Sequence, residues 1–311
     1  MKQHVFAPLR FGNLADLIRE SPHERPAGEW PKLSIVTPSY NQGSFLERTI
    51  RSVLDQAYPN LELIVIDGGS TDNTLEIIRR YERHITYWVS EKDSGQSDAL
   101  NKGFKRATGE FVGWQNSDDV YLPGSFFEAV DALRQNPEID VAFANRLDVD
   151  EDDRITAECR FTPFSRIGYW YEGMSMSNQS AFWRRSVFER VGYFDVDLHA
   201  AMDYEFFLRC AFNGIRFRHF RRYWGAIRRH RASKGSVLWP VALKGDCDLI
   251  DARYGRKKVL NVPLRIYSTL RRVIYYTLRG DFDYLTHGII RRSAAAIHPP
   301  LSPAARERSV Q

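Results

Sequence analysis

Two adjacent carboxylates stand in the segment Asn116-Ser117-Asp118-Asp119, directly after the apolar run 110–114. If that run is a strand, Asp118 and Asp119 lie in the loop at its carboxyl end. Oxygen ligands grouped in this way can hold a hard divalent cation, Mg²⁺ or Mn²⁺, which keeps coordination positions for the phosphate oxygens of a substrate. An Asx turn or a helix cap before Pro123 explains the same residues equally well. The tetrad alone leaves a cation site and a plain turn as alternatives.

A second polar loop, 67–72, reads Asp-Gly-Gly-Ser-Thr-Asp. Its glycines would let the backbone come close to a ligand, and Asp67 could accept a hydrogen bond from an N–H group of a nucleobase. Asp72 or Asn73 would cap the next helix, and a simple strand-to-helix turn is the competing interpretation. Because the chain has neither GxGxxG nor GxxxxGK followed by Ser or Thr, we predict no dinucleotide-binding Rossmann site and no P-loop.

These loops need a scaffold, and the apolar periodicity of the chain predicts one. Apolar, β-branched runs indicate strands at 33–37, 61–66, 85–89, 110–114 and 140–144. Apolar residues at helical spacing indicate helices from residue 44, near 73–83, near 96–107 and near 125–135. Ser44 with Glu47, and Ser125 with Glu128, have the spacing of capping boxes. This alternation predicts an α/β fold with a mostly parallel sheet and helices on both faces.

In such a sheet, ligands bind at the carboxyl ends of the strands, which here are followed by polar loops. The motifs around these loops resemble family 2 glycosyltransferases, which adopt the GT-A fold. Their nucleotide-sugar-binding half is matched by LSIVTPSYN at 33–41, IVIDGGSTD at 64–72, SEKDSGQSDALNKG at 90–103 and NSDD at 116–119. Later segments are similar as well: NQSAFW at 178–183, RSVFERVGYFD at 185–195, MDYEF at 202–206 and RRHRASK at 228–234. Several ordered motifs are more specific than one, and they span roughly residues 31–235.

The resemblance implies roles for individual residues. Asp119 would bind the metal that bridges the donor diphosphate, and Asp118 would contact the ribose or the outer shell of the metal. Because the chain has Ser-Asp-Asp rather than a strict Asp-x-Asp, this division of roles stays open. His230 would complete the metal site or touch the diphosphate, with Lys234 or Arg231 neutralising phosphate nearby. Further donor contacts are implied for Pro38, Tyr40, Asp67, Gln96 and Asp98.

Asp203 stands where the family has its catalytic base, although Met202 replaces the Glu that usually precedes it. We expect Asp203 to begin a helix that ends at Asn213-Gly214 and whose N-terminus favours the ionised carboxylate. Such a base would take the proton of the acceptor hydroxyl during an inverting displacement. A plain helix cap is the alternative role for Asp203, and Glu205 is the second candidate for the base.

Three other features invite functional and structural interpretations. The aromatic residues between Phe161 and Trp183 could form an acceptor wall, but core packing explains most of them. His84, His199 and His219 are isolated, which favours surface or hydrogen-bonded core positions. The acidic segment 148–153 lacks the EF-hand pattern, and we expect a solvated turn there.

The composition is that of a globular protein, with 43% hydrophobic and 27% charged residues among 311. The chain contains no apolar run of about 18 residues, so no membrane span is predicted. The N-terminus lacks the apolar stretch of a secretory signal. The 3 cysteines include no CxxC pair, which argues against a disulfide framework or a cysteine zinc site. We therefore expect a cytoplasmic protein.

The net charge of +5 is uneven, because residues 251–311 carry 12 Lys or Arg against 4 Asp or Glu. Arginines interleave with apolar residues over 260–279 and 286–297, which predicts one or two basic amphipathic helices. Two arrangements stay open. The helices could dock on the anionic cytoplasmic face of a membrane, where lipid-linked acceptors would be found, or pack on the catalytic domain with basic faces in water. Residues 298–311 are expected to be disordered.

The predicted organisation has a lead segment at 1–30, a GT-A domain at 31–239 and a basic helical extension at 240–311. Within the domain, 31–120 would bind the nucleotide sugar and 121–239 the acceptor. With the resemblance, the sequence predicts an inverting, Mg²⁺- or Mn²⁺-dependent glycosyltransferase that uses a nucleotide diphosphate sugar, with uracil as the expected base. Its acceptor would be a hydroxyl of a glycan or lipid-linked polysaccharide precursor. The alternatives are a nucleotidyltransferase and a non-catalytic sugar-binding or scaffold protein; nucleic acid is not an expected partner.

Overall fold

The computed structural model describes residues 12–20, 28–230, 233, 241–256, 260–282 and 284–285. The loop 116–119, which carries Asp118 and Asp119, is called the acidic loop below. The elements before it are α1 (Leu14–Glu20), β1 (Leu33–Ser39), α2 (Leu46–Leu54), β2 (Leu61–Asp67), α3 (Thr74–Tyr81), the 3₁₀ turn η1 (Glu82–His84), β3 (Tyr87–Ser90), α4 (Gln96–Arg106) and β4 (Phe111–Trp114). After it come β5 (Val120–Tyr121), α5 (Ser125–Gln135), β6 (Val141–Val149), β7 (Ile155–Cys159), α6 (Arg166–Glu172), η2 (Asn178–Ser180), β8 (Ala181–Arg184), α7 (Val187–Val191), α8 (Met202–Phe212), β9 (Phe217–Arg228), α10 (Val241–Tyr254) and α11 (Asn261–Leu278).

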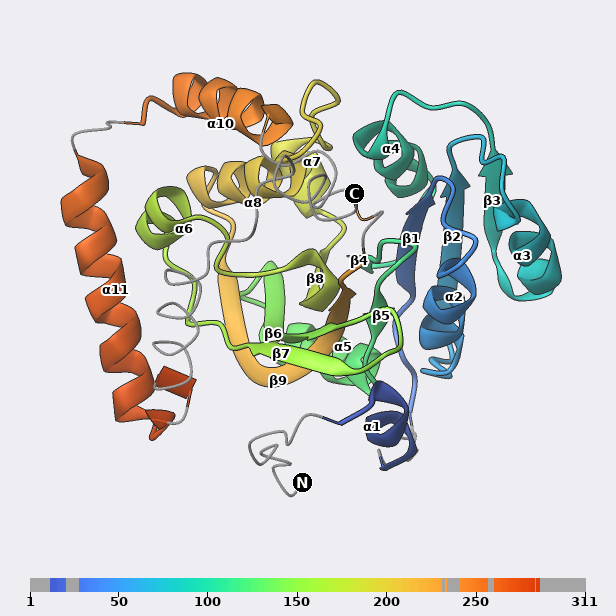
Figure 1. Cartoon of the computed structure of the whole chain (residues 1–311), viewed down its shortest axis with the longest axis horizontal. Coiled ribbons are helices and arrows are strands. Elements are labelled where there is room, and N and C mark those ends of the chain that lie inside the picture. The colour runs from blue at the N-terminus through green and yellow to red at the C-terminus, as the bar shows by residue number, and fades with distance from the viewer. Residues whose placement is uncertain are drawn as a thin grey trace, which may run out of the picture.

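Nine strands of the described residues form one sheet, in the order β3-β2-β1-β4-β8-β6-β9-β5, with β7 paired to β6. The strands β3, β2, β1 and β4 are parallel neighbours. Strand β6 also runs parallel to β9, whereas β8, β7 and β5 are antiparallel to their neighbours. Figure 1 shows the parallel strands on one side and the curved pair β6–β9 beside them. The predicted α/β fold with a mostly parallel sheet is confirmed, and the antiparallel strands belong to its second half.

Two helical layers cover the sheet because side chains alternate across each strand. On β1, Leu33 and Ile35 pack into the core shared with α2, α3 and α5. Val36 faces the opposite core, shared with α4, α7 and α8. The carboxyl ends of β1, β2 and β4 therefore open between two packed layers.

Both predicted capping boxes are wrong. Helix α2 begins at Leu46, and its N-cap Phe45 makes no side-chain cap. Helix α5 begins at Ser125 itself, after Gly124 in a left-handed conformation (φ 79°). Glu128 instead accepts a hydrogen bond from Nε1 of Trp224 (2.8 Å). Glu128, which the local spacing assigned to a cap, therefore bonds to a residue distant in sequence instead.

The acidic segment 148–153 contains the predicted solvated turn, exposed at Glu151 and Asp152, and the residues on either side of the turn are tied to the sheet. Strand β6 continues to Val149, beyond the predicted 140–144. Arg228 Nη1 bonds to the Asp153 carboxylate (2.5 Å) and to the carbonyl oxygen of Asp150 (3.1 Å). Arg229 donates to Asp148 (3.0 Å). These ion pairs hold the hairpin β6–β7 against the end of β9.

The C-terminal helices pack on the body of the protein. Helix α10 adds Ile250 to the core beneath α8, and α11 lies along α6 (Figure 1). Two arginines of α11 point to the body: Arg265 donates to the carbonyl of Tyr171 (3.0 Å) and Arg271 to that of Pro163 (3.0 Å). Most side chains that α11 turns to solvent are apolar, and Arg265 is exposed among them, so both predicted arrangements of this helix stay predictions.

No helix among the described residues combines the length and apolar character needed to cross a bilayer. The expected helix at 286–297 and the expected disorder at 298–311 lie outside the described residues, as does the start of the lead segment before residue 12. The division of the chain at residues 30 and 239 stays a prediction.

Candidate active site

Asp119 lies deep in the loop after β4, with 2% of its surface exposed. Its Oδ2 accepts hydrogen bonds from Asn116 Nδ2 (3.0 Å) and Gln179 Nε2 (2.7 Å), and its Oδ1 accepts from the backbone N–H of Arg228 (2.9 Å). Burial and the negative charge of Asp118 raise the pKa of Asp119 to about 7. The three donors favour the ionised form and oppose this rise. They also fix the carboxylate from three elements: the loop itself, η2 and β9.

Asp118 is the more open member of the acidic pair, with 16% of its side chain exposed. Its Oδ2 lies 3.0 Å from Nε2 of His230, a residue 112 positions away. The imidazole ring packs beside Phe45 of the loop before α2, with ring centroids 4.4 Å apart. The structure therefore brings together two predicted site residues, Asp118 and His230, at the point where β9 ends.

Sequence reasoning missed the groups that hold this acidic loop in place. Gln179, which bonds to Asp119, lies in the NQSAFW segment, where only the family resemblance drew attention to it. Gly225 of β9 lies against it, because a Cβ at this position would stand 1.9 Å from the Gln179 carbonyl oxygen. Arg228 reaches the loop through its side chain as well, donating to the carbonyl of Asp118 (3.1 Å). No local pattern signals contacts that cross the sheet in this way.

Asp67, at the end of β2, is fully buried. Its carboxylate accepts from the backbone N–H groups of Gly69 (3.1 Å) and Ser70 (2.9 Å) and from the hydroxyl of Ser90 (2.6 Å), and the Ser70 hydroxyl also bonds to it. Asp67 thus shapes the glycine loop and joins it to β3. Its predicted contact with a nucleobase stays a prediction.

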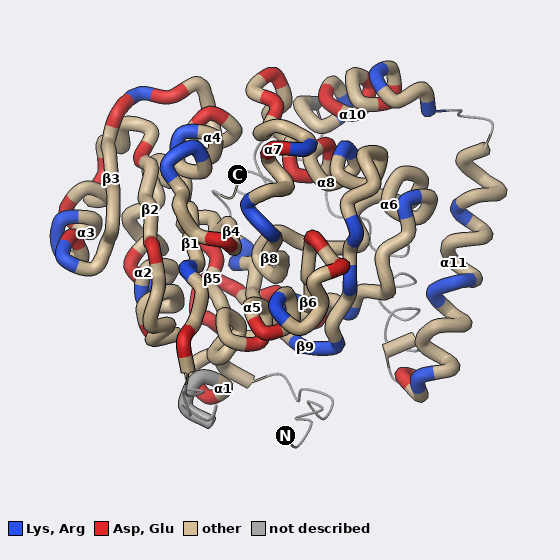
Figure 2. The backbone as a smooth tube through the Cα atoms, turned by 180° about the vertical axis from the view of Figure 1, so that it is seen from behind, with Lys and Arg blue, Asp and Glu red and all other residues tan. Residues whose placement is uncertain are grey.

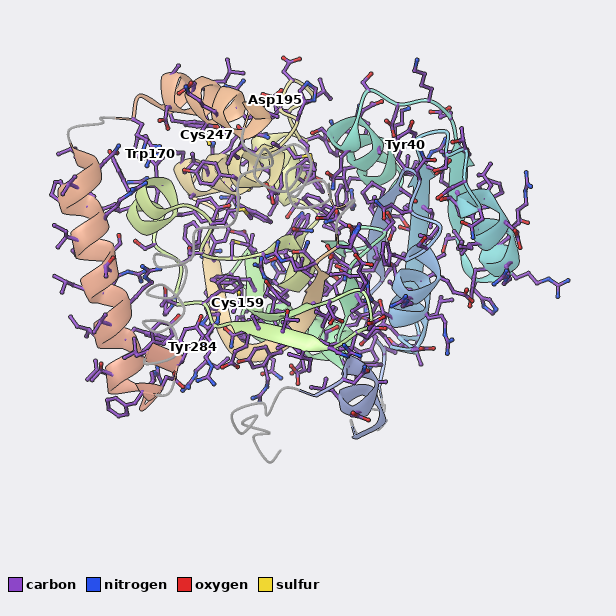
Figure 3. All side chains as sticks on the ribbon, viewed as in Figure 1. Tyr40, Cys159, Trp170, Asp195, Cys247 and Tyr284 are labelled. Atoms are coloured by element: carbon purple, nitrogen blue, oxygen red, sulfur yellow. The ribbon has the colours of Figure 1, made fainter. Side chains whose placement is uncertain are left out.

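Tyr40 follows β1 and is 60% exposed, whereas Pro38 is buried within that strand. The next residue, Asn41, has a left-handed φ of 51° and accepts a hydrogen bond from the N–H of Thr71 (2.8 Å). These contacts tie the loops after β1 and β2 together and leave the Tyr40 ring at the carboxyl edge of the sheet (Figure 3). Of Pro38 and Tyr40, two of the implied donor contacts, Tyr40 is the one with an accessible ring.

The first turn of α4 connects the acidic loop with the helix that carries Asp203. Gln96 Nε2 donates to Asn116 Oδ1 (2.7 Å), and Asn116 in turn bonds to Asp119. The neighbouring Ser97 hydroxyl contacts the sulfur of Met202 (2.8 Å), the residue before Asp203. The acidic loop and the start of α8 therefore adjoin the same helical turn.

Asp98 belongs to that same turn and stabilises it. Its Oδ2 accepts from the backbone N–H of Ser94 (3.2 Å) and lies 3.3 Å from the Lys102 ammonium. The N-cap residue, Gly95, has no side chain to bond to the first N–H groups of α4. The predicted donor contact of Asp98 stays a prediction beside this structural role.

Helix α8 begins at Met202, so Asp203 lies in its first turn rather than at its cap. The Asp203 carboxylate is half-buried, and its Oδ1 accepts the N–H of Tyr204 (2.8 Å). Glu205, the second candidate for the base, has no exposed surface and is bound by Arg209 (2.9 Å) and the Tyr254 hydroxyl (2.6 Å). A carboxylate held in this way cannot reach an acceptor hydroxyl, so Glu205 is excluded.

Most other candidates have structural roles. Tyr169, Phe182 and Trp183 are buried in the cores, as packing rather than an acceptor wall would require. His219 is a partly buried, hydrogen-bonded residue, with Nε2 2.9 Å from Asn145 Oδ1. Burial lowers the pKa of His219 to about 4. Arg231 and Lys234, the predicted phosphate contacts, lie outside the described residues.

No group of three His, Cys, Asp or Glu side chains within the described ranges makes a complete metal site. The donor set at the acidic loop does suit a hard divalent cation, because the Asp118 carboxylate and the His230 imidazole adjoin, with Asp119 behind them. Mg²⁺ and Mn²⁺ commonly take one or two protein carboxylates and complete their coordination with water and substrate phosphates. The residues present fit a cation site that the bound substrate would complete.

Two family profiles match this chain. The one described as Glycosyl transferase family 2 covers residues 34–192, and the one described as Glycosyl transferase family group 2 covers residues 116–279. An uncharacterized glycosyltransferase of Mycobacterium tuberculosis is 33% identical over 184 residues, which are 58% of this chain and 69% of the relative. TuaG of Bacillus subtilis, whose name refers to teichuronic acid biosynthesis, is 43% identical over 96 residues, 29% of this chain and 37% of TuaG.

Solved structures share the fold at low sequence identity. Residues 1–349 of Staphylococcus aureus TarS, in complex with UDP-GlcNAc, superpose with a TM-score of 0.61 at 20% identity, covering 75% of this chain and 69% of that one. A further TarS structure is matched over 41% of its chain. The mannosyltransferase PcManGT of Pyrobaculum calidifontis, in complex with GDP-Man and Mn²⁺, superposes with a TM-score of 0.56 at 20% identity, covering 95% of this chain and 84% of that one.

Proposed function

The chain belongs to glycosyl transferase family 2, and on that premise we propose that it is an inverting, divalent-cation-dependent enzyme. It transfers a sugar from a nucleotide diphosphate donor, with UDP as the expected nucleotide, to a hydroxyl of a glycan or lipid-linked polysaccharide precursor. UDP-GlcNAc bound to TarS and GDP-Man bound to PcManGT support a nucleotide-sugar donor. TuaG, named for teichuronic acid biosynthesis, supports a polysaccharide acceptor.

One observation carries the proposal: a single turn of α4 joins the acidic loop to the start of α8. Gln96 bonds to Asn116 on one side, and Ser97 contacts Met202 on the other. A cation-dependent transferase needs carboxylates that hold the cation beside the leaving diphosphate and a separate carboxylate near the incoming hydroxyl. Asp118 with Asp119, and Asp203, supply these groups from adjoining elements.

Asp203 is the proposed catalytic base. As the acceptor oxygen attacks the anomeric carbon, its proton passes to the Asp203 carboxylate, and the bond to the nucleotide diphosphate breaks. The N-terminal turn of α8 favours the ionised carboxylate that this step requires. Direct displacement inverts the configuration at the anomeric carbon.

Asp118, Asp119 and His230 are the proposed cation ligands. Asp118 has open surface and the neighbouring imidazole, whereas both oxygens of Asp119 already accept hydrogen bonds from the protein. We therefore propose that Asp118 makes the more exposed contact, with the cation or the ribose, and that Asp119 is a buried ligand whose hydrogen bonds also fix the loop. A bound Mg²⁺ or Mn²⁺ would neutralise the charge that develops on the leaving diphosphate. Pro38, Tyr40, Asp67, Gln96 and Asp98 are the proposed donor contacts, and Tyr40 has the most exposed ring among them.

The exposed face of α11 supports a peripheral contact with the anionic cytoplasmic face of a membrane. Its apolar side chains Val262, Ile266, Leu270, Ile274 and Leu278 are 56–80% exposed. The helix contains three arginines and no Asp or Glu, and Figure 2 shows no acidic position along its tube. An apolar face backed by arginines suits a helix that lies in the surface of an anionic bilayer. An anionic membrane suits this face better than a second copy of the chain, because a second copy would bring two positively charged helices together.

The test begins with a thermal-shift panel of nucleotide sugars with and without Mn²⁺, because the true donor should raise the melting temperature most. Release of the nucleotide diphosphate by wild-type protein is then compared with that by Asp203→Asn. We expect Mn²⁺-dependent release that the substitution abolishes. If no donor is bound or cleaved, a non-catalytic sugar-binding or scaffold protein is the better conclusion. Release of pyrophosphate from a nucleoside triphosphate and a sugar phosphate would identify a nucleotidyltransferase.

A further inference from the structure

The N-cap residue of the helix that carries Asp203 offers no side-chain acceptor. This residue is Ala201, with φ −122° and ψ 24°, and alanine is among the poorest residues at the position. Within the first turn, Asp203 Oδ1 accepts the N–H of Tyr204. The backbone that leads into this turn, Ala200 and Ala201, is held by a residue from another helix.

Asp246 of α10 supplies an acceptor for the N–H groups of the two residues that precede α8. Its Oδ2 accepts hydrogen bonds from the backbone N–H groups of Ala200 (2.6 Å) and Ala201 (2.8 Å). Only 4% of Asp246 is exposed, so water competes little for these bonds. A negative charge at this end of a helix is also favoured by the helix dipole. The cap thus comes from a residue 45 positions along the chain from Ala201.

Further contacts hold the same loop and helix from both sides. On the α4 side, Ser97 Oγ lies 3.3 Å from the carbonyl of Leu198. On the α10 side, Arg253 pairs with Asp195 (2.7 Å), and the Tyr254 hydroxyl bonds to Glu205 (2.6 Å). Figure 3 shows Asp195 close to the part of α10 that carries Cys247. The loop before α8 is therefore fixed between α4 on one side and α10 on the other.

We infer that Asp246 is a positioning residue for the transfer reaction: it caps α8 from α10 and so fixes the backbone turn that presents Asp203 to the acceptor. The inference rests on the proposed role of Asp203. It gives α10, which lies outside the 34–192 match, a part in catalysis without contact to substrate. Small displacements of a reacting group cost large factors in rate, so loss of this cap should lower kcat more than donor binding.

The test compares Asp246→Ala, Asp246→Asn and the control Tyr254→Phe in the full-length protein. Asp246→Ala should lower kcat by about tenfold or more while the donor KM stays near the wild-type value. Asp246→Asn should restore most of kcat, because its amide oxygen can still accept from both N–H groups. Tyr254→Phe loosens the same pair of helices but leaves the Asp203 turn bonded, so its kcat should stay near wild type.

Amide hydrogen exchange at Ala200 and Ala201 gives a readout that does not depend on activity. Asp246→Ala should speed exchange at both amides, and Asp246→Asn should largely restore their protection. Wild-type kcat in Asp246→Ala would overturn the inference, as would an equal loss of kcat in Tyr254→Phe. Full activity of Asp203→Asn, with the exchange result intact, would overturn the base assignment instead and leave the cap standing.

Discussion

At the scale of single residues, the acidic pair divides a structural task from a binding task. Asp119 accepts three protein hydrogen bonds, whereas Asp118 contacts His230 and keeps open surface. We expect Asp118→Asn to fold normally, because an amide oxygen can replace the acceptor for His230. It should lower cation affinity and transfer rate by about tenfold or more. A titration of melting temperature against Mn²⁺ measures this, with Asp131→Asn on α5 as the control; an unchanged titration would remove Asp118 from the cation site.

His219 gives a prediction about pH and stability. Burial lowers its pKa from 6.5 to about 4 in the folded protein, so the unfolded chain binds a proton in this range that the folded protein does not. Its contribution is fully present above the unfolded pKa and is lost as the pH falls from 6.5 towards 4. That loss should be about 2 kcal/mol between pH 7.5 and pH 5. Urea unfolding of the wild-type protein and of His219→Gln at pH 7.5 and pH 5 measures this loss of stability. An equal pH dependence of stability in the two proteins would contradict the prediction.

The residues that could be predicted are those whose type alone suggests chemistry. Asp118 and His230 were expected at one site, and they are hydrogen-bonded there. Gln179 and Asp246 could not be found in this way, because an amide or a carboxylate far along the chain carries no local sign of its partner. Only the three-dimensional path of η2 and α10 gives these residues their roles.

At the scale of elements, the close approach of β9 to η2 sets the position of the acidic loop. Gly225 permits it, because a Cβ would stand 1.9 Å from the Gln179 carbonyl oxygen. Gly225→Ala should therefore push the two segments apart, lower stability by about 1–3 kcal/mol and weaken the Gln179–Asp119 bond. Cation affinity should fall together with stability.

The matched control is Gly245→Ala on α10, where a Cβ would meet no atom within 4 Å. Alanine inside a helix should stabilise this position, by up to about 1 kcal/mol relative to glycine. Urea unfolding and Mn²⁺ titration of both variants compare them. Equal stability of Gly225→Ala and wild type would show that β9 and η2 can separate without cost.

From β1 to β4 the elements were predictable although their ends were not, whereas β5, β7, β8 and β9 were not predicted. The helix at 96–106 and the strands at 33–39 and 61–67 follow the apolar periodicity closely. Strand β6 extends to Val149 because β7 and β9 pair along it, and this pairing is not visible in a local window. The cap predictions at Ser44 and Ser125 failed for a related reason: the ends of these helices are set by the loops that precede them.

At the scale of the whole molecule, α11 exposes many of its apolar side chains. Val262, Ile266, Leu270, Ile274 and Leu278 are 56–80% exposed, and Arg265 is exposed as well. Arg265 and Arg271 donate to main-chain carbonyls next to α6, which are neutral acceptors. An exposed apolar face with arginines along it is the arrangement expected of a helix that rests on an anionic lipid surface.

That arrangement leads to a test on vesicles. Ile266 and Leu270 are each 56% exposed, so Ile266→Glu and Leu270→Glu should leave folding intact while placing a charge in the apolar face. Flotation with phosphatidylglycerol-containing vesicles should carry the wild-type protein and lose both variants, whereas pure phosphatidylcholine should carry much less. Leu249→Glu on α10, where the wild-type side chain is 55% exposed, is the control and should still float. If wild-type protein stays unbound and instead forms a dimer that Leu270→Glu dissociates, the face pairs with a second copy and the membrane contact is wrong.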